Sequence, residues 1–264
     1  MKWSDLLLRN GIVGGEIIHP EFHTHLNYVQ FLERESSDLT LSFGNELTKS
    51  ICSEDVRLKK KIKIINVTLA NIQSEHKSVV EEPEYSEVCC AWIPVKSYYL
   101  IFHTLLVLEY LLQCDGEVLI SGHDESRRKL RAFLADRTLN FNKPIFNEIC
   151  SSEEAMSWSV SVGANLRTTN ADPDEYKRLI LRKLFDYKKE EIKRNSKIKR
   201  LTRKALESSG FFKANMTLFD FFYFYRIKVN YRDLEFMQEG LSHEQYKDFY
   251  MSYVELTYNL ATIP

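Results

Sequence analysis

Glycine and proline are scarce in this chain, with nine and six among 264 residues. Sandwich and barrel architectures need frequent turn residues, so this scarcity disfavours them relative to helices. The chain is 44% hydrophobic and 12% aromatic, which suffices for one large core or two small ones and excludes disorder as the main state. We therefore expect a mainly α-helical fold.

Several catalytic motifs are also missing. The sequence has no glycine-rich phosphate loop, no nucleophile elbow and no helical His-Glu-x-x-His pair, so NTP hydrolysis, serine hydrolysis and zinc proteolysis lack support. The cysteines are odd in number and lack metal-site spacing: Cys52, Cys89, Cys90, Cys114 and Cys150. We expect no cofactor, no bound metal and a reducing, cytoplasmic setting.

Long apolar runs are absent as well. Residues Met1 to Val13 contain no continuous apolar segment and no small-residue cleavage site, which argues against secretion. The most apolar run, Tyr98 to Leu112, includes His103 and Glu109 and falls short of the roughly 20 residues that cross a bilayer. We interpret it as a buried core helix and expect no membrane association.

Helical spacing of apolar residues is the strongest pattern that is present. It predicts an amphipathic helix over Val56 to His76, a loop over Lys77 to Tyr85, and a core helix from Pro94 to about Gln113. Asp124 is placed to cap a further helix that runs to about Arg137. These elements form the first half of a helical bundle.

Two capping boxes mark helices near the end of the chain. Thr217 with Asp220 precedes a helix that we expect to reach about residue 238, and Ser242 with Gln245 precedes the last helix. The last helix carries apolar residues at helical spacing on one face. Together they predict a closing helical hairpin.

A small β element is also expected. Gly11 to Ile18 and Leu39 to Phe43 are β-prone, and Met156 to Val162 alternates apolar residues with serines, as a half-buried strand does. His19, Glu21, His23 and His25 lie in the polar segment after the first of these. His23 and His25 would share one side of an extended strand, as metal ligands can, but exposed loop histidines are the interpretation we favour.

The charge is strongly uneven along the chain, although the net charge is −1. Lys177 to Lys204 holds thirteen Lys or Arg against three acids and is predicted to be one long basic helix ending near Ser208 to Gly210. Such a helix can neutralise phosphates, with Tyr176, Phe185 and Tyr187 available for base stacking. The expected nucleic-acid contacts are Lys188, Lys189, Lys193, Arg194, Lys197, Lys199, Arg200, Arg203 and Lys204. A solvated helix face and an acidic protein partner are the alternatives.

Three segments carry a resemblance to a known family. Tyr98-Tyr99-Leu100-Ile101-Phe102-His103 and Arg226-Ile227-Lys228-Val229-Asn230-Tyr231 are similar to the two helix motifs of the HEPN superfamily, and Gly122-His123 is similar to a segment between them. The resemblance covers about residues 95–140 and 215–262. It implies an HEPN-like helical domain over 91–264, with an insertion at about 141–214 that carries the basic helix, after a mixed region at 1–90.

The resemblance also implies a function. HEPN ribonucleases cleave RNA without a metal, commonly as dimers and in prokaryotic toxin or defence systems, which places Arg226, His103, His123, Asn230 and Tyr231 in the candidate catalytic site. Those enzymes carry a His four to six residues after the Arg, whereas no Arg in this chain has a His at that spacing. An inert HEPN module therefore remains open, one that binds nucleotide, nucleic acid or a protein such as a nucleotidyltransferase.

Arg226 can also be interpreted without the resemblance. It shares a helix face with Asn230 among aromatic residues, so its guanidinium should be partly desolvated and needs an anionic partner. A phosphate matches a guanidinium in geometry, but a structural ion pair with the carboxylate of Asp233 or Glu109 is the interpretation we favour for a single buried Arg. His103 could likewise be a core histidine with a satisfied hydrogen bond.

Overall fold

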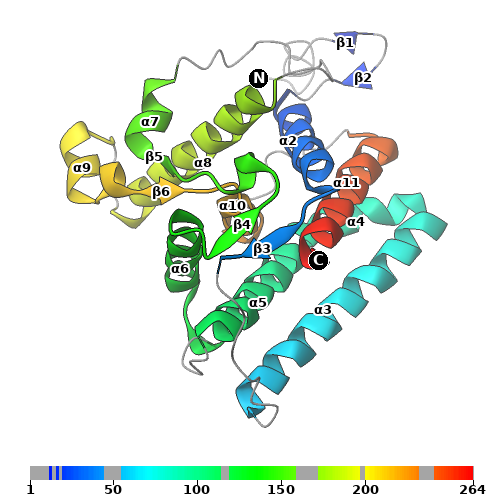
Figure 1. Cartoon of the computed structure of the whole chain (residues 1–264). Coiled ribbons are helices and arrows are strands. Elements are labelled where there is room, and N and C mark those ends of the chain that lie inside the picture. Colours follow the sequence, from blue (N-terminus) through cyan, green and yellow to red (C-terminus); the bar gives the residue numbers. More distant parts are fainter. Residues whose placement is uncertain are drawn as a thin grey trace.

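The computed structural model describes residues 12–13, 16–17, 20–44, 55–113, 119–158, 172–196, 200–231 and 241–263, and these residues are mainly helical (Figure 1). The mainly α fold is therefore confirmed. The helices are α2 (Pro20–Ser36), α3 (Val56–Glu81), α4 (Ser86–Cys90), α5 (Ile93–Gln113), α6 (His123–Ala135), α7 (Ser152–Ser157), α8 (Pro173–Asn195), α9 (Arg203–Ser208), α10 (Asp220–Tyr231) and α11 (His243–Ala261). Short 3₁₀ turns are η1 (Pro83–Tyr85), η3 (Pro144–Phe146) and η4 (Phe211–Lys213).

The β structure consists of short antiparallel pairs. They are β1 (Ile12–Val13) with β2 (Glu16–Ile17), β3 (Leu41–Phe43) with β4 (Leu139–Phe141), and β5 (Cys150–Ser151) with β6 (Asn215–Met216). The prediction of β structure is confirmed in part: β1 and β2 lie within the stretch at 11–18, and β3 forms residues 41–43 of the stretch at 39–43. The strand predicted at Met156 is wrong, because the Ser151 hydroxyl accepts a hydrogen bond from the Glu154 amide and starts helix α7, which contains Met156. Residues 159–162 of that prediction lie outside the described residues.

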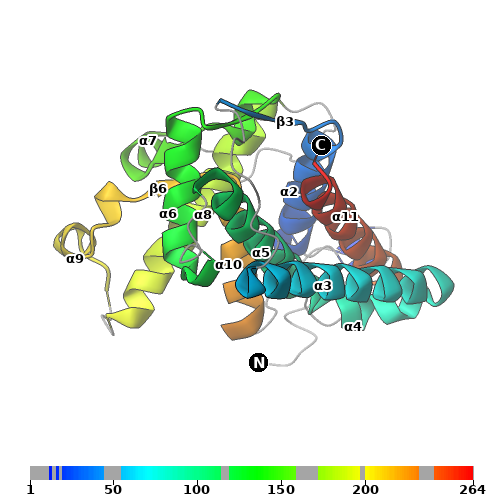
Figure 2. The ribbon, with the colours of Figure 1, turned by 60° about the horizontal axis from the view of Figure 1, so that its bottom comes forward.

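Helix α5 is the central helix and packs against α3, α6, α10 and α11 (Figures 1 and 2). Leu100 and Leu106 are fully buried, and the predicted core helix is confirmed in its position and its central place. Its segment Ile93–Leu112, of 20 residues, is also long and apolar enough by composition to cross a membrane. In this structure α3, α4, α6, α10 and α11 pack against it.

Helix α3 runs antiparallel to α5 along one side of the molecule (Figures 1 and 2). Leu58 near its start packs in one cluster with Tyr110 near the end of α5, and Glu75 near its end forms an ion pair with Lys96 near the start of α5. The prediction of a loop over Lys77 to Tyr85 is wrong for residues 77–81, which continue helix α3. Val79 is fully buried, so the apolar face continues and the helix extends for one more turn.

Helix α2 occupies the polar, histidine-bearing segment for which no helix was expected. Phe22, Val29 and Leu32 are buried against α11, and this helical spacing explains the helix despite the polar residues between them. His23 and His25 therefore do not share one side of a strand, and His25 is fully buried rather than exposed. His19 and the side chain of Glu21 lie outside the described residues, and among the residues described no group of His, Cys, Asp and Glu is suited to bind a metal.

The closing helices follow the predicted capping boxes. The Ser242 hydroxyl accepts from the Gln245 amide, the Gln245 side chain accepts from the Ser242 amide, and the Asp220 carboxylate accepts from the Thr217 amide at 2.8 Å. Tyr253 of α11 contacts aromatic residues of α10. The predicted continuation of α10 to residue 238 lies outside the described residues beyond 231.

The basic region is built differently from the single long helix that its composition predicts. Helix α8 ends at Asn195, a separate short helix α9 covers Arg203–Ser208, and Gly210 ends that segment with a φ of 72°. Leu181, Leu184 and Phe185 of α8 are buried in the same hydrophobic core as α2 and α11. The core thus includes residues from both sides of the predicted boundary at residue 90 and from the predicted insertion, although the domain division itself remains a prediction.

Candidate functional site

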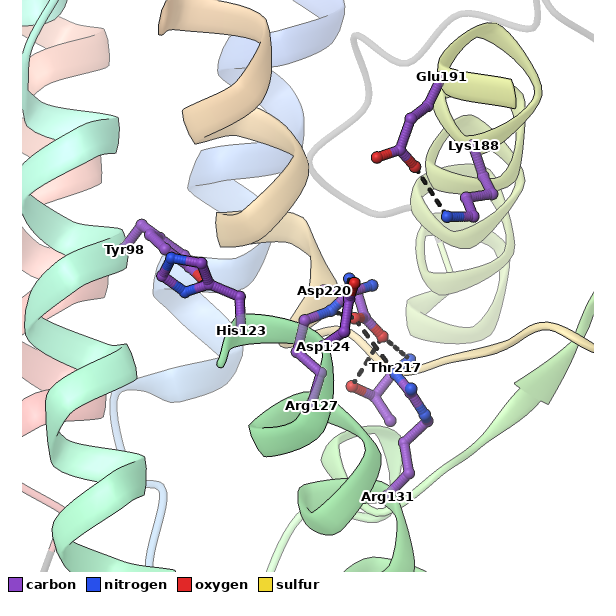
Figure 3. A network of polar contacts seen from close by, with 9 residues as sticks. All are labelled: Tyr98, His123, Asp124, Arg127, Arg131, Lys188, Glu191, Thr217 and Asp220. Carbon is purple, nitrogen blue, oxygen red and sulfur yellow. Dashed lines mark hydrogen bonds and ion pairs between the residues drawn. The ribbon is translucent and has the colours of Figure 1, made fainter. Parts of the chain in front are cut away.

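The structure brings together five side chains that lie far apart in the sequence. Tyr98, Tyr99 and His103 come from α5, His123 stands at the start of α6, and Arg226 lies on α10; we call these residues the Arg226 cluster. The Tyr98 hydroxyl and His123 Nδ1 form a hydrogen bond of 2.6 Å (Figure 3), and Arg226 Nη1 donates to the Tyr99 hydroxyl at 3.2 Å. The histidines and the arginine of the three resembling segments therefore belong to one site.

Arg226 sits in a box of tyrosine rings and is only 9% exposed. Its Cζ lies 4.8 Å from the centre of the Tyr98 ring, 5.7 Å from that of Tyr99 and 5.5 Å from that of Tyr223. Cation–π contacts of this kind contribute roughly 0.5–2 kcal/mol each when desolvated, far less than the cost of burying a charge. The guanidinium is therefore stabilised only in part by its surroundings.

No carboxylate completes the site among the residues that the structure describes. Arg226 forms no ion pair there, and its Nε is buried without a hydrogen-bond partner. Glu109, one of the two predicted carboxylate partners, instead accepts a hydrogen bond of 2.7 Å from the Ser126 hydroxyl. Asp233, the other, lies outside the described residues. An anionic ligand would supply the negative charge and the hydrogen-bond acceptor that the guanidinium lacks.

His123 is held neutral at neutral pH by its environment. Burial, followed by the positive charges of Arg226 and Arg127, lowers its pKa, while Asp124 opposes the shift. When Nδ1–H donates to the Tyr98 oxygen, Nε2 carries a lone pair that can accept a proton; when Tyr98 donates to Nδ1, Nε2–H can donate to an anion. Both tautomers suit a phosphodiester beside Arg226.

His103 lies one helical turn after Tyr99, with the two rings stacked at 6.3 Å. Burial is the main cause that lowers its pKa to about 4, with contributions from Lys61 and His123. Its Nδ1 is buried without a hydrogen-bond partner, so it is not the satisfied core histidine of the alternative interpretation. The Phe102 ring contacts both His103 and His123, at 5.3 Å and 4.3 Å between ring centres.

A buried ion-pair network fixes the helix that carries His123 (Figure 3). Arg127 Nε of α6 donates to Asp220 Oδ1 of α10 at 2.5 Å, Arg131 Nη1 lies 3.5 Å from the same oxygen, and Asp220 is 2% exposed. The Arg127 Cζ also lies 3.9 Å from the centre of the Tyr223 ring. Sequence reasoning identified Asp220 only as a capping residue, because its long-range partners leave no local pattern.

A cavity beside the cluster is too small for a nucleotide. Among the described residues it has a volume of about 20 Å³, room for about one water, between α5, α6 and α10, and Tyr98, Phe102, Arg127 and Tyr223 line it. A polynucleotide would therefore meet the cluster at the protein surface rather than in a deep pocket.

The predicted cationic residues of the basic region divide into two groups. Lys188 pairs with Glu191 at 2.8 Å, Lys189 with Asp186 at 3.0 Å, and Arg203 with Glu207 at 3.1 Å. The other predicted residues that the structure describes, Lys193, Arg194, Arg200 and Lys204, are exposed and form no ion pair there. Lys197 and Lys199 lie outside the described residues.

The stacking role predicted for the aromatic residues of this region is wrong. Tyr176, Phe185 and Tyr187 are 6%, 0% and 6% exposed, because they face the core side of α8. Asn230 and Tyr231 end α10, but their side chains lie outside the described residues, so their predicted place in the site stays a prediction.

One polar site was missed by sequence reasoning. His25 is buried between Tyr225, whose hydroxyl bonds its Nδ1, and Tyr187, whose hydroxyl lies 3.4 Å from its Nε2. Lys228, 6% exposed, places its Nζ 3.4 Å from the same nitrogen. The signal available was the helical spacing of apolar residues around His25, which places it on the buried face of α2.

Comparison with known family models, curated proteins and solved structures finds no match to this chain. The HEPN resemblance therefore rests on the quoted motifs alone, and it stays a prediction.

Proposed function

We propose that the chain is an HEPN-like RNA-binding or RNA-cleaving protein that holds a backbone phosphate at the Arg226 cluster. One observation carries the proposal: the guanidinium of Arg226 is nine-tenths buried, lacks a carboxylate among the described residues, and has an unbonded Nε, while its charge acts on His123 nearby. Guanidinium groups bind phosphates in a matched, two-pronged geometry. A phosphodiester would satisfy the unbonded donor.

The same residues can carry out metal-independent cleavage. Neutral His123 would take the proton of the ribose 2′-hydroxyl through Nε2 while Tyr98 accepts from Nδ1–H. The 2′-oxygen then bonds to phosphorus, the bond to the 5′-oxygen breaks, and solvent returns a proton to that leaving oxygen. Arg226 would stabilise the added charge on the phosphorane. The products would be a 2′,3′-cyclic phosphate and a 5′-hydroxyl end.

The alternative is an inert HEPN module that binds nucleotide, nucleic acid or a protein partner without cleaving. The missing Arg-to-His spacing favours it, because His123 and Arg226 come from separate helices. A homodimer, a cytoplasmic setting, a role in prokaryotic toxin or defence systems and a nucleotidyltransferase partner all follow from the resemblance and belong to the proposal.

The test is incubation of labelled single-stranded RNA with the purified protein, with and without EDTA, for wild type and His123→Gln. Cleavage that survives EDTA, yields cyclic phosphate ends and disappears in His123→Gln supports the ribonuclease. Binding without cleavage supports the inert module. The absence of both binding and cleavage would contradict the proposal.

A further inference from the structure

A second strongly charged surface lies at the start of α3, and composition did not single it out. The first two turns carry Arg57, Lys59, Lys60, Lys61 and Lys63, which we call the α3 basic patch. No Asp or Glu occurs from Val56 to Ser74, so no acid on the helix itself offsets these five cations. We propose that the α3 basic patch binds the RNA backbone next to the Arg226 cluster, an inference that rests on the proposed function.

The four lysines of the patch, Lys59, Lys60, Lys61 and Lys63, are not held in ion pairs by the part of the fold that the structure describes. Positive side chains in the first turn of a helix, here Arg57 and Lys59, oppose the helix dipole. The carboxylate of Asp55 caps the helix by accepting from the amides of Arg57 and Leu58, which offsets this only in part. The arrangement suits an anionic partner.

The patch lies beside the cluster because α3 and α5 are antiparallel. Leu58 packs with Tyr110, so Lys61 stands about one turn further along α3 and closer to His103. Arg57 shares the face of Lys61, four residues away. The charge of Lys61 also contributes to the lowered pKa values of both His103 and His123, as expected for a cation next to them.

The surface around the patch fits an extended chain of phosphates. Lys59, Ile62, Lys63 and Val67 line a shallow, open depression along α3, and Ile62 and Val67 are 42% and 52% exposed. Aliphatic side chains between ammonium groups offer contact for riboses and bases beside the charges. Each neutralised phosphate releases counterions, which makes such binding salt-sensitive.

The basic region of α8 and α9 is less suited to this role. Lys188, Lys189 and Arg203 are engaged in ion pairs there. Helix α9 also projects from the side of the molecule opposite to α3 (Figures 1 and 2), whereas the start of α3 adjoins α5. A strand held at the Arg226 cluster would therefore meet the α3 basic patch first.

The test compares two variants that each remove three exposed cations. Lys59→Gln/Lys60→Gln/Lys63→Gln changes the α3 basic patch, and Lys193→Gln/Arg194→Gln/Lys204→Gln is the matched control on α8 and α9. We expect the first to weaken binding of a single-stranded RNA about ten-fold or more. It should also reduce the slope of log affinity against log salt by about 2, since each single-strand contact contributes roughly 0.7. The control should bind nearly as wild type does, and both should melt within a few degrees of it.

Three results would overturn the inference. In the first, wild type binds RNA, the α3 variant binds with unchanged affinity and the control binds more weakly. This result would assign the RNA backbone to α8 and α9 and leave the proposed function intact. No RNA binding by wild type would remove the proposed function and the inference together. Binding of phosphatidylserine vesicles through the α3 basic patch, without RNA binding, would assign the patch to a membrane surface.

Discussion

The Tyr98 hydroxyl lies 2.6 Å from His123 Nδ1, although the two residues stand on different helices. This bond sets which ring nitrogen of His123 faces away from the tyrosine, and therefore which nitrogen is available to a ligand. Tyr98 also presents its ring to Arg226 at 4.8 Å. One side chain thus contacts both of the groups to which we assign chemistry.

Tyr98→Phe should separate these two contacts. The ring under Arg226 is retained, while the hydrogen bond that orients His123 is lost, at a stability cost of about 1 kcal/mol. We expect kcat/KM for RNA cleavage to fall about ten-fold or more, as loss of an orienting bond to a general base does, with RNA affinity nearly unchanged. Tyr99→Phe is the matched control, because it removes the hydroxyl that accepts from Arg226 and leaves His123 as it is. Equal losses in both variants would contradict the orienting role.

Glu109 should make the protein less stable as the pH rises, the reverse of the usual effect of a carboxyl group. Burial raises its pKa to about 7, although Ser126 and Lys129 oppose the shift. The folded state then binds a proton that the unfolded state releases, so stability falls as pH rises from the ordinary glutamate range to about 7. Glu109→Gln should raise the unfolding free energy at pH 8 by about 1–2 kcal/mol and flatten this fall. Denaturant unfolding at pH 5 and pH 8 measures both, and a variant less stable at pH 8 than wild type would refute the account.

Asp220 should be essential for stability, whereas its exposed neighbour in the network should not. Asp220→Asn leaves Arg127 without its buried partner and should cost about 2–4 kcal/mol, because an uncompensated buried charge remains. Asp124, 87% exposed, pairs with the same arginine at 3.2 Å, so Asp124→Asn should change stability by less than about 1 kcal/mol. Thermal unfolding of the two variants compares them directly. A small effect at Asp220 would show that the network does not anchor α6 to α10.

The sequence predicted those elements whose signals are local. The amphipathic period of α3, the apolar run of α5 and the capping boxes before α10 and α11 each need only a few neighbouring residues, and each proved correct in kind. Helix α2 was not predicted, because the polar residues between its buried apolar residues obscure their helical spacing. The alternation of apolar residues and serines from Met156 predicted a strand, but the Ser151 cap starts a helix that contains Met156.

The candidate site was predictable only in part. The resemblance assigned His103, His123 and Arg226 to one site, but no spacing in the sequence could show that they lie together or that Tyr98 joins them. The basic region illustrates the limit of composition, which counts charges without showing that Lys188 and Lys189 are already paired. Long-range partners such as Asp220 and Arg127 have no local signature and required the fold.

The central claim is that Arg226 binds a backbone phosphate, and Arg226→Met tests it most directly. The measurement is the affinity for a single-stranded oligonucleotide with 2′-deoxyriboses, which keeps every phosphate and cannot be cleaved, together with the melting temperature of each protein. We predict an affinity loss of about ten-fold or more, the equivalent of roughly 1.4 kcal/mol, with melting nearly as in wild type. Unchanged affinity, with melting lowered as much as by removal of a core aromatic such as Phe221, would make Arg226 a structural residue and contradict the account.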